Sequence, residues 1–153
     1  MATEIERKFL VRDRSVLSGL AGTHIGQGYL ADNGMTVRVR VAGDKGFLTL
    51  KSNTQGLSRA EFEYPIPLSD AEDLLNGHAS LGRLTKVRYL IPVRDVTFEV
   101  DVFEGELDGL VVAEVELGSE EQDFPRPAWL GDEVSHDPRY RNSELAVSRR
   151  VPA

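Results

Sequence analysis

Charged residues alternate with apolar ones along seven short segments of this chain, and this alternation constrains the fold more than any other feature. The first segment reads EIERKFLV and begins at Glu4. Successive side chains of a β-strand point to opposite faces, so Glu4, Glu6 and Lys8 share one face and the apolar residues share the other. Alternate residues lie about 6.6 Å apart in a strand. Two carboxylates at this spacing repel each other unless a cation or water lies between them.

The same alternation recurs in six further segments. Their charged residues are Arg38 and Arg40, Lys51, Arg59 with Glu61 and Glu63, Lys86 and Arg88, Glu99 and Asp101, and Glu114 and Glu116. A wet face of an antiparallel sheet is the simplest interpretation, but such a face usually mixes in Thr, Ser and Gln. Like charges held side by side destabilise a sheet. The repetition therefore favours a barrel whose charged faces line a polar lumen and whose apolar faces point outward, where helices would cover them.

The strand-like segments fall near residues 3–11, 24–31, 35–42, 46–53, 58–67, 82–92, 96–104 and 109–117. Helix signals are fewer: residues 13–21, a capping box from Ser69 to Glu72, a start at Ser119 that prolines soon end, and residues 142–149. So few helices do not suit a parallel sheet with crossover helices. We expect one domain over residues 1–153, of the mostly β (α+β) class. Its core would be a closed antiparallel β-barrel of about eight strands with a few helices outside.

Composition excludes several classes of protein. The chain has 153 residues, a net charge of −7 and no cysteine. It therefore has no disulfide or thiolate metal site, and it fits a reducing compartment. Without an apolar leader or a long apolar run, we expect neither a signal peptide nor a membrane span, and a cytoplasmic location. The negative charge argues against a general nucleic-acid binder, but it is compatible with a local basic site for a small polyanion.

Seven charged motifs follow one another in a fixed order. They are E-x-E-x-K at the start, R-x-R, the lysine of LTLK, E-x-E, K-x-R, E-x-D and a final E-x-E. Together with QGYL, WLGDEV and DPRYRNSELA, they resemble the CYTH superfamily, also called triphosphate tunnel metalloenzymes. The resemblance covers nearly the whole chain and is closest to short bacterial members that hydrolyse inorganic triphosphate. It implies an antiparallel β-tunnel, in agreement with the barrel that the alternation favours.

The resemblance also implies a role for each kind of charge. Basic residues would hold the phosphates, because Arg pairs with phosphate oxygens through two hydrogen bonds and Lys acts as a point charge. This clamp consists of Lys8, Arg38, Arg40, Lys51, Lys86 and Arg88. Acids would hold Mg²⁺ or Mn²⁺, which prefer oxygen ligands. The metal ligands would be Glu4, Glu6, Glu114 and Glu116, with Glu61, Glu63 and Asp101 as further ligands or as groups that orient them. For each residue alone, a salt bridge inside the lumen is the alternative, and we interpret Arg59 and Glu99 as structural.

Tyr29 is a candidate for the general base. In the short bacterial members this tyrosine stands beside the motif lysine, so the resemblance implies a dyad of Tyr29 and Lys8. An adjacent ammonium group favours the ionised form of a phenol, which can accept a proton from the attacking water. Two alternatives stay open. Glu63 or a water held by the metal takes the proton, or Tyr29 is a barrel aromatic whose hydroxyl is hydrogen-bonded.

The expected activity is metal-dependent hydrolysis of the terminal phosphoanhydride of inorganic triphosphate, without a covalent enzyme intermediate. A class IV adenylate cyclase, which makes cyclic AMP from ATP in the same tunnel, is the first alternative and would need an adenine pocket at one mouth. The second is a non-enzymatic polyphosphate or nucleotide-binding module, although a pure anion binder gains nothing from acids beside the phosphate. The expected partner is a small polyanionic triphosphate, with neither nucleic acid nor membrane, and a homodimer is compatible with the sequence.

Overall fold

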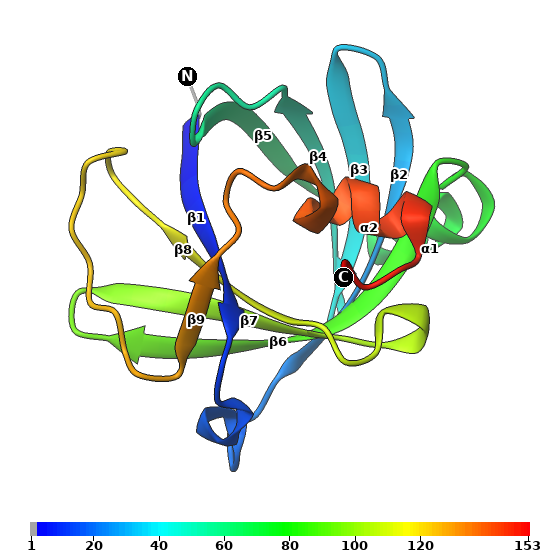
Figure 1. The fold of residues 1–153 in the computed structure, drawn as a ribbon. Coiled ribbons are helices and arrows are strands. Elements are labelled where there is room, and N and C mark those ends of the chain that lie inside the picture. Colours follow the sequence, from blue (N-terminus) through cyan, green and yellow to red (C-terminus); the bar gives the residue numbers. More distant parts are fainter. Residues whose placement is uncertain (1–2) are drawn as a thin grey trace.

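The computed structural model describes residues 3–153 and consists mainly of antiparallel strands (Figure 1). The strands are β1 (Thr3–Val11), β2 (Thr23–Asp32), β3 (Met35–Ala42), β4 (Lys45–Ser52), β5 (Ser58–Ile66), β6 (Gly82–Val93), β7 (Val96–Phe103), β8 (Val111–Glu116) and β9 (Leu130–Glu133). The α-helices are α1 (Leu68–Gly77) and α2 (Asn142–Ser148), and the short 3₁₀ turns are η1 (Arg14–Leu17), η2 (Gly105–Leu107) and η3 (Pro138–Tyr140). Within residues 3–153 no helix is long and apolar enough to cross a membrane.

The strands close into a barrel. Eight of them follow the order β5-β4-β3-β2-β6-β7-β8-β1, and the pairing of β1 with β5 joins the two ends, with Thr3 opposite Ala60. The short strand β9 extends the sheet beyond β1, with Leu130 opposite Val11. The expected closed antiparallel barrel of about eight strands is thereby confirmed. The ninth strand was not expected, because its four residues are too few to show an alternation.

The register sets charged residues of neighbouring strands on one face. Lys8 of β1 lies opposite Glu114 of β8, and Lys51 of β4 lies opposite Glu61 of β5. Residues directly opposite each other share a face of the sheet. All four line the cavity inside the barrel. The charged rows thus form the inner surface, as the alternation predicted.

The apolar outer face of β1, β7 and β8 is covered by a loop, which corrects the expectation of a helix from Ser119. Residues 118–129 contain no helix, yet Phe124 and Trp129 of this segment pack on the core that includes Phe9 and Phe98. The Phe98 and Trp129 ring centroids lie 5.2 Å apart. The segment contains two prolines, which lack a backbone donor and restrict the residues before them. The stretch before them is too short to form a stable helix.

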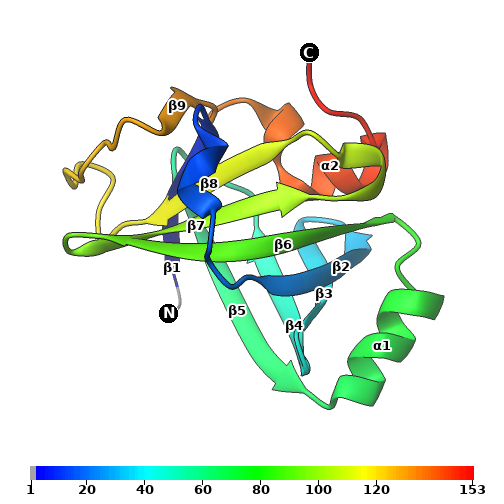
Figure 2. The same ribbon diagram turned by 90° about the horizontal axis from the view of Figure 1, so that it is seen from below.

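Helix α1 packs against the outer surface of β2, β3 and β4, where glycines make room for it. A Cβ added to Gly28 of β2 would lie 2.5 Å from the Cβ of Ala79 and 3.0 Å from Leu75. A Cβ on Gly46 of β4 would lie 2.6 Å from the Cβ of Ala71. These distances are shorter than real Cβ contacts, so the close approach of this helix requires glycine. Figure 2 shows the two helices apart from each other.

The start of α1 differs from the expected capping box. The helix begins at Leu68, and Pro67 occupies the N-cap position without a side-chain hydrogen bond. Ser69 therefore lies inside the first turn. Pro67 carries no backbone donor that the cap would have to satisfy, and its ring fixes the backbone angle at which the chain enters the helix. A helix was also expected over residues 13–21, but the structure has only the short 3₁₀ turn η1 there.

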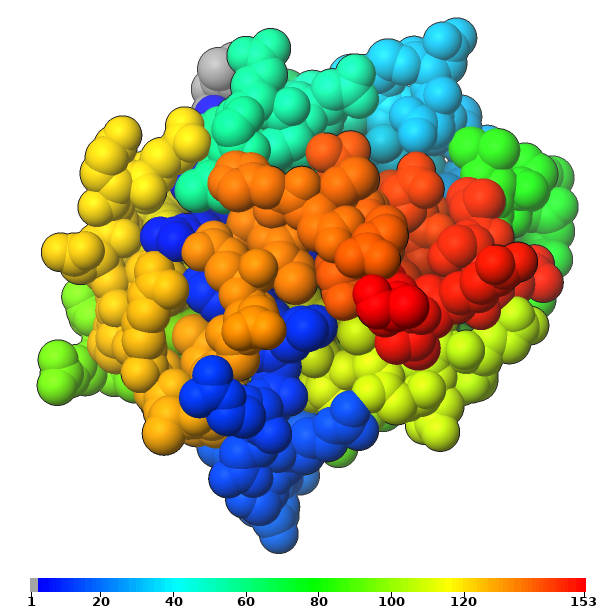
Figure 3. Space-filling model, in the orientation of Figure 1, coloured from blue at the N-terminus to red at the C-terminus, as the bar shows by residue number. Residues whose placement is uncertain are grey.

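The C-terminal segment crosses one mouth of the barrel. In Figure 1 it runs from β9 past the opening into α2, and in Figure 3 its atoms cover the centre of this face. Leu145 and Ala146 of α2 are fully buried and pack with Leu84, Phe103 and Val112. Leu84, Phe103 and Val112 each lie two positions from a charged residue of the same strand that faces inward. Their side chains therefore face inward as well. An apolar layer thus closes this end of the tunnel beneath α2.

Candidate active site

The barrel encloses a cavity of about 200 Å³ that gathers nearly all of the predicted site residues. Those that line it are Glu4, Glu6, Lys8, Tyr29, Arg38, Arg40, Lys51, Glu61, Glu63, Lys86, Arg88, Glu114 and Glu116. Further lining residues are Thr36, Arg59, Glu99, Arg141, Asn142 and Ser143. Of the predicted set, only Asp101 is absent from the wall. None of the described lining residues is aliphatic, and Tyr29 is the only aromatic one.

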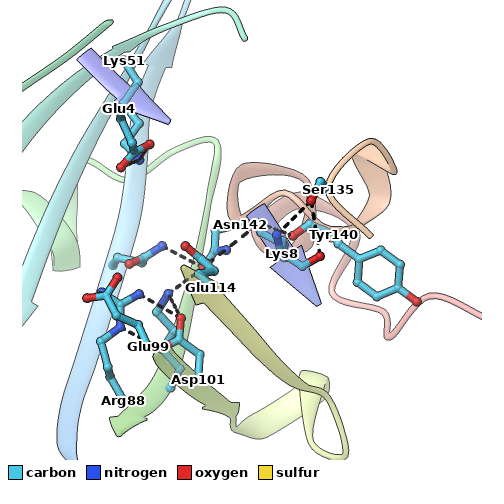
Figure 4. A network of polar contacts seen from close by, with 12 residues as sticks. Glu4, Lys8, Lys51, Arg88, Glu99, Asp101, Glu114, Ser135, Tyr140 and Asn142 are labelled. Carbon is cyan, nitrogen blue, oxygen red and sulfur yellow. Dashed lines mark hydrogen bonds and ion pairs between the residues drawn. The ribbon is translucent and has the colours of Figure 1, made fainter. Parts of the chain in front are cut away.

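Asp101 of β7 lies behind the wall and holds two of the basic residues (Figure 4). It has no exposed surface. Its carboxylate accepts from Lys86 Nζ at 2.7 Å and from Arg88 Nε and Nη2 at 2.8 and 2.9 Å. Burial raises the pKa of Asp101, but Lys86 and Arg88 outweigh it and lower the pKa below its usual value. Of the two roles that the sequence allowed, this geometry favours orienting neighbouring groups over binding metal.

The pKa values of Lys86 and Arg88 of β6 shift in opposite directions, although both residues bind Asp101. Burial lowers the pKa of Lys86 to about 7, although Asp101 opposes the shift. The pKa of Arg88 is raised, because its hydrogen bonds and attraction to Asp101 outweigh burial. Arg88 Nη1 also donates to Glu99 at 3.2 Å. Both cations are thus held in place from behind.

Arg38 of β3 carries an unsatisfied donor. Its Nη2 donates to Thr49 Oγ1 at 3.2 Å and to Glu63 Oε2 at 3.3 Å. Glu63 also accepts from the Thr49 hydroxyl at 2.8 Å. The Arg38 Nε is buried and has no hydrogen-bond partner among residues 3–153. A buried guanidinium donor without an acceptor is costly, so this atom suits an anionic oxygen brought in by a ligand.

Lys51 bridges two acids at another part of the wall. Its Nζ lies 3.0 Å from Glu4 Oε1 and 3.1 Å from Glu61 Oε2. Glu4 also lies 3.4 Å from Arg59 Nε. Burial raises the pKa of Glu4, but Lys51 and Arg59 bring it below its usual value. The pKa of Glu61 is raised by burial and by Glu4, against the attraction of Lys51.

Glu6 and Glu114 form a second group of acids. Burial, with the negative charges of Glu114 and Glu4, raises the pKa of Glu6 to about 8. Glu114 has the opposite shift, because Lys8, Lys86 and Arg88 together outweigh its burial and hold its pKa well below the usual value. Burial and the nearby acids of the lumen also raise the pKa of Glu116. The nearby bases thus favour the charged form of Glu114, whereas the pKa of Glu6 stays raised.

This donor set suits a hard divalent cation that shares its coordination with a ligand. No group of three or more His, Asp or Glu side chains within residues 3–153 is arranged to hold a metal ion by itself. Mg²⁺ in phosphate-transfer sites is usually held by one or two carboxylates, with substrate phosphates and waters completing the shell. Glu6 beside Glu114 provides such a pair, and the pKa of Glu6 is raised first by burial and then by repulsion from Glu114 and Glu4, which a cation would relieve.

Tyr29 and Lys8 both line the cavity, but each has a partner of its own. Lys8 Nζ donates to the backbone oxygen of Tyr140 at 3.0 Å and lies 3.9 Å from Glu114 (Figure 4). The Tyr29 hydroxyl accepts from Gln27 Nε2 at 3.0 Å. No hydrogen bond joins Tyr29 to Lys8 in the described part of the chain. The present hydrogen bonds therefore do not show the dyad that the resemblance implies.

Several polar residues of the site were missed in the sequence, among them two that contact the basic clamp. Gln27 is fully buried and accepts from Arg40 Nε and Nη2 at 2.9 and 2.7 Å. Asn142, the first residue of α2, accepts from Lys86 Nζ at 2.8 Å and from Gln27 Nε2 at 3.2 Å. Gln27 precedes Tyr29 by two residues, so the strand alternation places it on the same face and could have identified it. Asn142 has no such signal, because it reaches the lumen from the segment that crosses the mouth.

Comparison with known proteins places the chain in a family. The CYTH domain family model matches residues 2–150. The inorganic triphosphatase of Acetivibrio thermocellus is 44% identical over 146 residues, which cover 95% of this chain and 94% of that protein. The inorganic triphosphatase of Nitrosomonas europaea is 43% identical over 153 residues, which cover 95% of this chain and 98% of that protein.

Solved structures agree with the fold. A crystal structure of an inorganic triphosphatase matches with a TM-score of 0.70 and 38% identity, covering 100% of this chain and 99% of that one. A Hippeastrum protein, described as an adenylyl cyclase with a dominant triphosphatase activity, shares the fold at a TM-score of 0.58 and 17% identity over 76% of this chain and 80% of its own. Because the family model and both bacterial relatives match almost from end to end, this chain belongs to the CYTH domain family.

Proposed function

We propose that this protein hydrolyses the terminal phosphoanhydride of inorganic triphosphate with the help of a divalent cation. The observation that carries the proposal is the cavity of about 200 Å³ inside the barrel, whose wall combines eight basic residues with seven acids and has no aliphatic member. The two bacterial relatives named inorganic triphosphatases support the choice of reaction. A chain of three phosphates needs many cationic donors, and a tunnel provides them on every side.

The basic residues bind and align the substrate. Arg38 offers its unpaired buried Nε to a phosphate oxygen. Lys86 and Arg88 are held by Asp101, so they keep their positions as charge shifts on the phosphoryl group. Groups that are already oriented lose little freedom when the transition state forms, and this is the main source of catalysis in phosphoryl transfer.

The acids would hold the metal ion. Glu6 and Glu114 are the first choice, since they lie together and both burial and the neighbouring acids raise the pKa of Glu6. Glu4 and Glu116 line the same cavity as this pair. When bound, Mg²⁺ or Mn²⁺ offsets negative charge on the phosphoryl oxygens.

The protein's own residues then handle the proton. Water attacks the terminal phosphorus, the bond to the bridging oxygen breaks, and phosphate and pyrophosphate are the products. Tyr29 is our first choice for the group that takes the proton from water, and Glu63 is the second. Glu63 is oriented by Thr49 and Arg38. No covalent enzyme intermediate is required.

The lining of the cavity favours inorganic triphosphate over ATP. A nucleobase is normally bound between apolar or aromatic side chains. The described lining residues include no aliphatic side chain, and the one aromatic residue, Tyr29, uses its hydroxyl in a hydrogen bond with Gln27. This cavity thus provides contacts for phosphates and no aliphatic surface for a base, which favours the inorganic substrate.

Phosphate release with tripolyphosphate, pyrophosphate, ATP and thiamine triphosphate, each with Mg²⁺, Mn²⁺ or Ca²⁺, tests the proposal. We expect the highest turnover with tripolyphosphate and Mg²⁺ or Mn²⁺, and none with a chelator. Chromatography of the ATP reaction separates cyclic AMP from ADP and AMP. Equal or higher turnover with ATP, or cyclic AMP as the main product, would overturn the proposal.

A further inference from the structure

The six basic residues of the proposed clamp differ in what holds them. Five lie within 3.9 Å of a carboxylate oxygen, namely Lys8, Arg38, Lys51, Lys86 and Arg88. Arg40 takes part in none of the ion pairs formed by residues 3–153. Its Nε and Nη2 donate instead to the side-chain oxygen of Gln27, at 2.9 and 2.7 Å.

The Gln27 side chain is held firmly enough to orient Arg40. It has no exposed surface. Its Nε2 donates to the Tyr29 hydroxyl at 3.0 Å and to Asn142 Oδ1 at 3.2 Å. Because Arg40 has only donors, the amide oxygen of Gln27 must face it, and the amide nitrogen must face the other two groups. Each atom of the amide thus has a partner.

A neutral partner leaves the charge of Arg40 without compensation. A carboxylate orients a guanidinium and also cancels most of its field, whereas an amide oxygen only orients it. Burial and the nearby guanidinium groups of Arg38 and Arg88 lower the pKa of Arg40 to about 10, so it remains protonated at neutral pH. Its charge is buried among like charges, and an anion would stabilise it most.

We propose that Gln27 is a positioning residue that keeps Arg40 as the uncompensated cation of the six-residue clamp, and that Arg40 is thereby the principal anchor of this clamp for the polyphosphate. The inference rests on the proposed function and deepens it, since it states which residue of the clamp contributes most to substrate binding. Glutamate has nearly the shape of glutamine and would hold Arg40 equally well. The amide at position 27 is therefore what keeps this cation available to the substrate.

Calorimetric titration of the metal-free protein with tripolyphosphate tests the inference without turnover. Gln27→Glu should weaken binding by about tenfold or more, because a close charge pair now opposes the ligand. Gln27→Met removes the acceptor and keeps the charge of Arg40. It should therefore weaken tripolyphosphate binding clearly less than Gln27→Glu does. Gln55→Glu adds the same charge on an exposed loop residue outside the cavity and should bind like the wild type.

Steady-state kinetics with Mg²⁺ provide the second measurement. Gln27→Glu should raise KM by more than it lowers kcat, as expected when an interaction with the bound substrate is lost. The inference fails if Gln27→Glu binds tripolyphosphate like the wild type, or if Gln27→Met weakens binding as much as Gln27→Glu does. In either case Gln27 acts only through packing and hydrogen bonds. Wild-type hydrolysis of tripolyphosphate decides the proposed function separately.

The reciprocal substitution keeps the inference testable if the buried variants do not fold. Glu63, the carboxylate partner of Arg38, is partly exposed. Glu63→Gln gives Arg38 a neutral partner of the kind that Arg40 already has, so metal-free binding of tripolyphosphate should tighten by about threefold or more. Unchanged or weaker binding in this variant would contradict the inference. It would show that neutralising a guanidinium with a carboxylate does not control how tightly the clamp binds tripolyphosphate.

Discussion

Glu4 and Glu6 stand two residues apart on one face of β1, yet their surroundings act on them in opposite directions. Burial raises the pKa of Glu4, but Lys51 at 3.0 Å and Arg59 lower it by more. Burial raises the pKa of Glu6 to about 8, and the negative charge of Glu114 adds to the effect. Without metal, Glu4 is a paired carboxylate that supports the fold, and ionised Glu6 opposes it.

The two substitutions should therefore change stability with opposite signs. In metal-free protein at pH 8, Glu4→Gln should lower the free energy of unfolding, because Lys51 and Arg59 lose a charged partner. Glu6→Gln should raise it, because it removes a charge that burial and repulsion from neighbouring acids both disfavour. Urea unfolding with a chelator present measures both. Destabilisation by Glu6→Gln would contradict this account, and both variants should lose Mg²⁺-dependent turnover.

The pH dependence of the metal-free protein follows from the same shift. Between the usual carboxyl value of 4.5 and about 8, the unfolded chain has ionised Glu6 while the folded protein keeps it protonated. The folded state then binds more protons, so the contribution of Glu6 to stability falls as pH rises through this window. Unfolding free energies measured from pH 5 to 8 should decline less steeply in Glu6→Gln than in the wild type. Equal slopes would show that Glu6 titrates normally.

Tyr29 and Glu63 are rival candidates for the group that takes the proton from water. If Tyr29 does so, Tyr29→Phe should keep tripolyphosphate binding and lower kcat by roughly 100-fold, the usual contribution of a general base. Glu63→Gln should then change kcat much less. The reverse ranking would assign the proton to Glu63. If both variants stay within about threefold of the wild type, neither side chain is the base.

At the scale of elements, the two α-helices serve different purposes. Helix α1 lies against the outside of the barrel, where Gly26, Gly28 and Gly46 admit it. Helix α2 lies over one mouth and contributes Asn142 to the lumen, where it accepts from Lys86. Disturbing α1 should therefore change stability, whereas disturbing the start of α2 should also change the site.

Gly28→Ala tests the first of these roles. The new Cβ would lie 2.5 Å from Ala79 and 3.0 Å from Leu75, so the helix must shift, at a cost of about 1–3 kcal/mol. We expect a lower thermal midpoint with an unchanged KM for tripolyphosphate. Gly77→Ala is the matched control, because nothing lies within 4 Å of its added Cβ. A loss of stability as large in Gly77→Ala would show that packing is not the cause.

At the scale of the whole molecule, closure of the barrel makes the site. The pairing of β1 with β5 brings Glu4 close to Lys51 and Arg59, which are about fifty residues away in the chain. The pairing of β2 with β6 sets Ile25 opposite Lys86 and so brings neighbouring Gln27 within reach of the same network. Two opposite charges that attract only weakly in water attract much more strongly inside such a lumen.

The alternation by itself favoured the class of fold and the inward direction of the charged rows, and it placed most residues of the cavity wall on one face of their strands. It could do so because the side-chain direction in a strand depends only on position along that strand. Tertiary structure decided which charges meet. It placed Asp101 behind Lys86 and Arg88, gave Arg40 a neutral partner, covered the outer face with a loop and closed one mouth with α2. These features depend on the register within the β2–β3 and β6–β7 pairs and on segments without alternation, and the alternation along a single strand encodes neither.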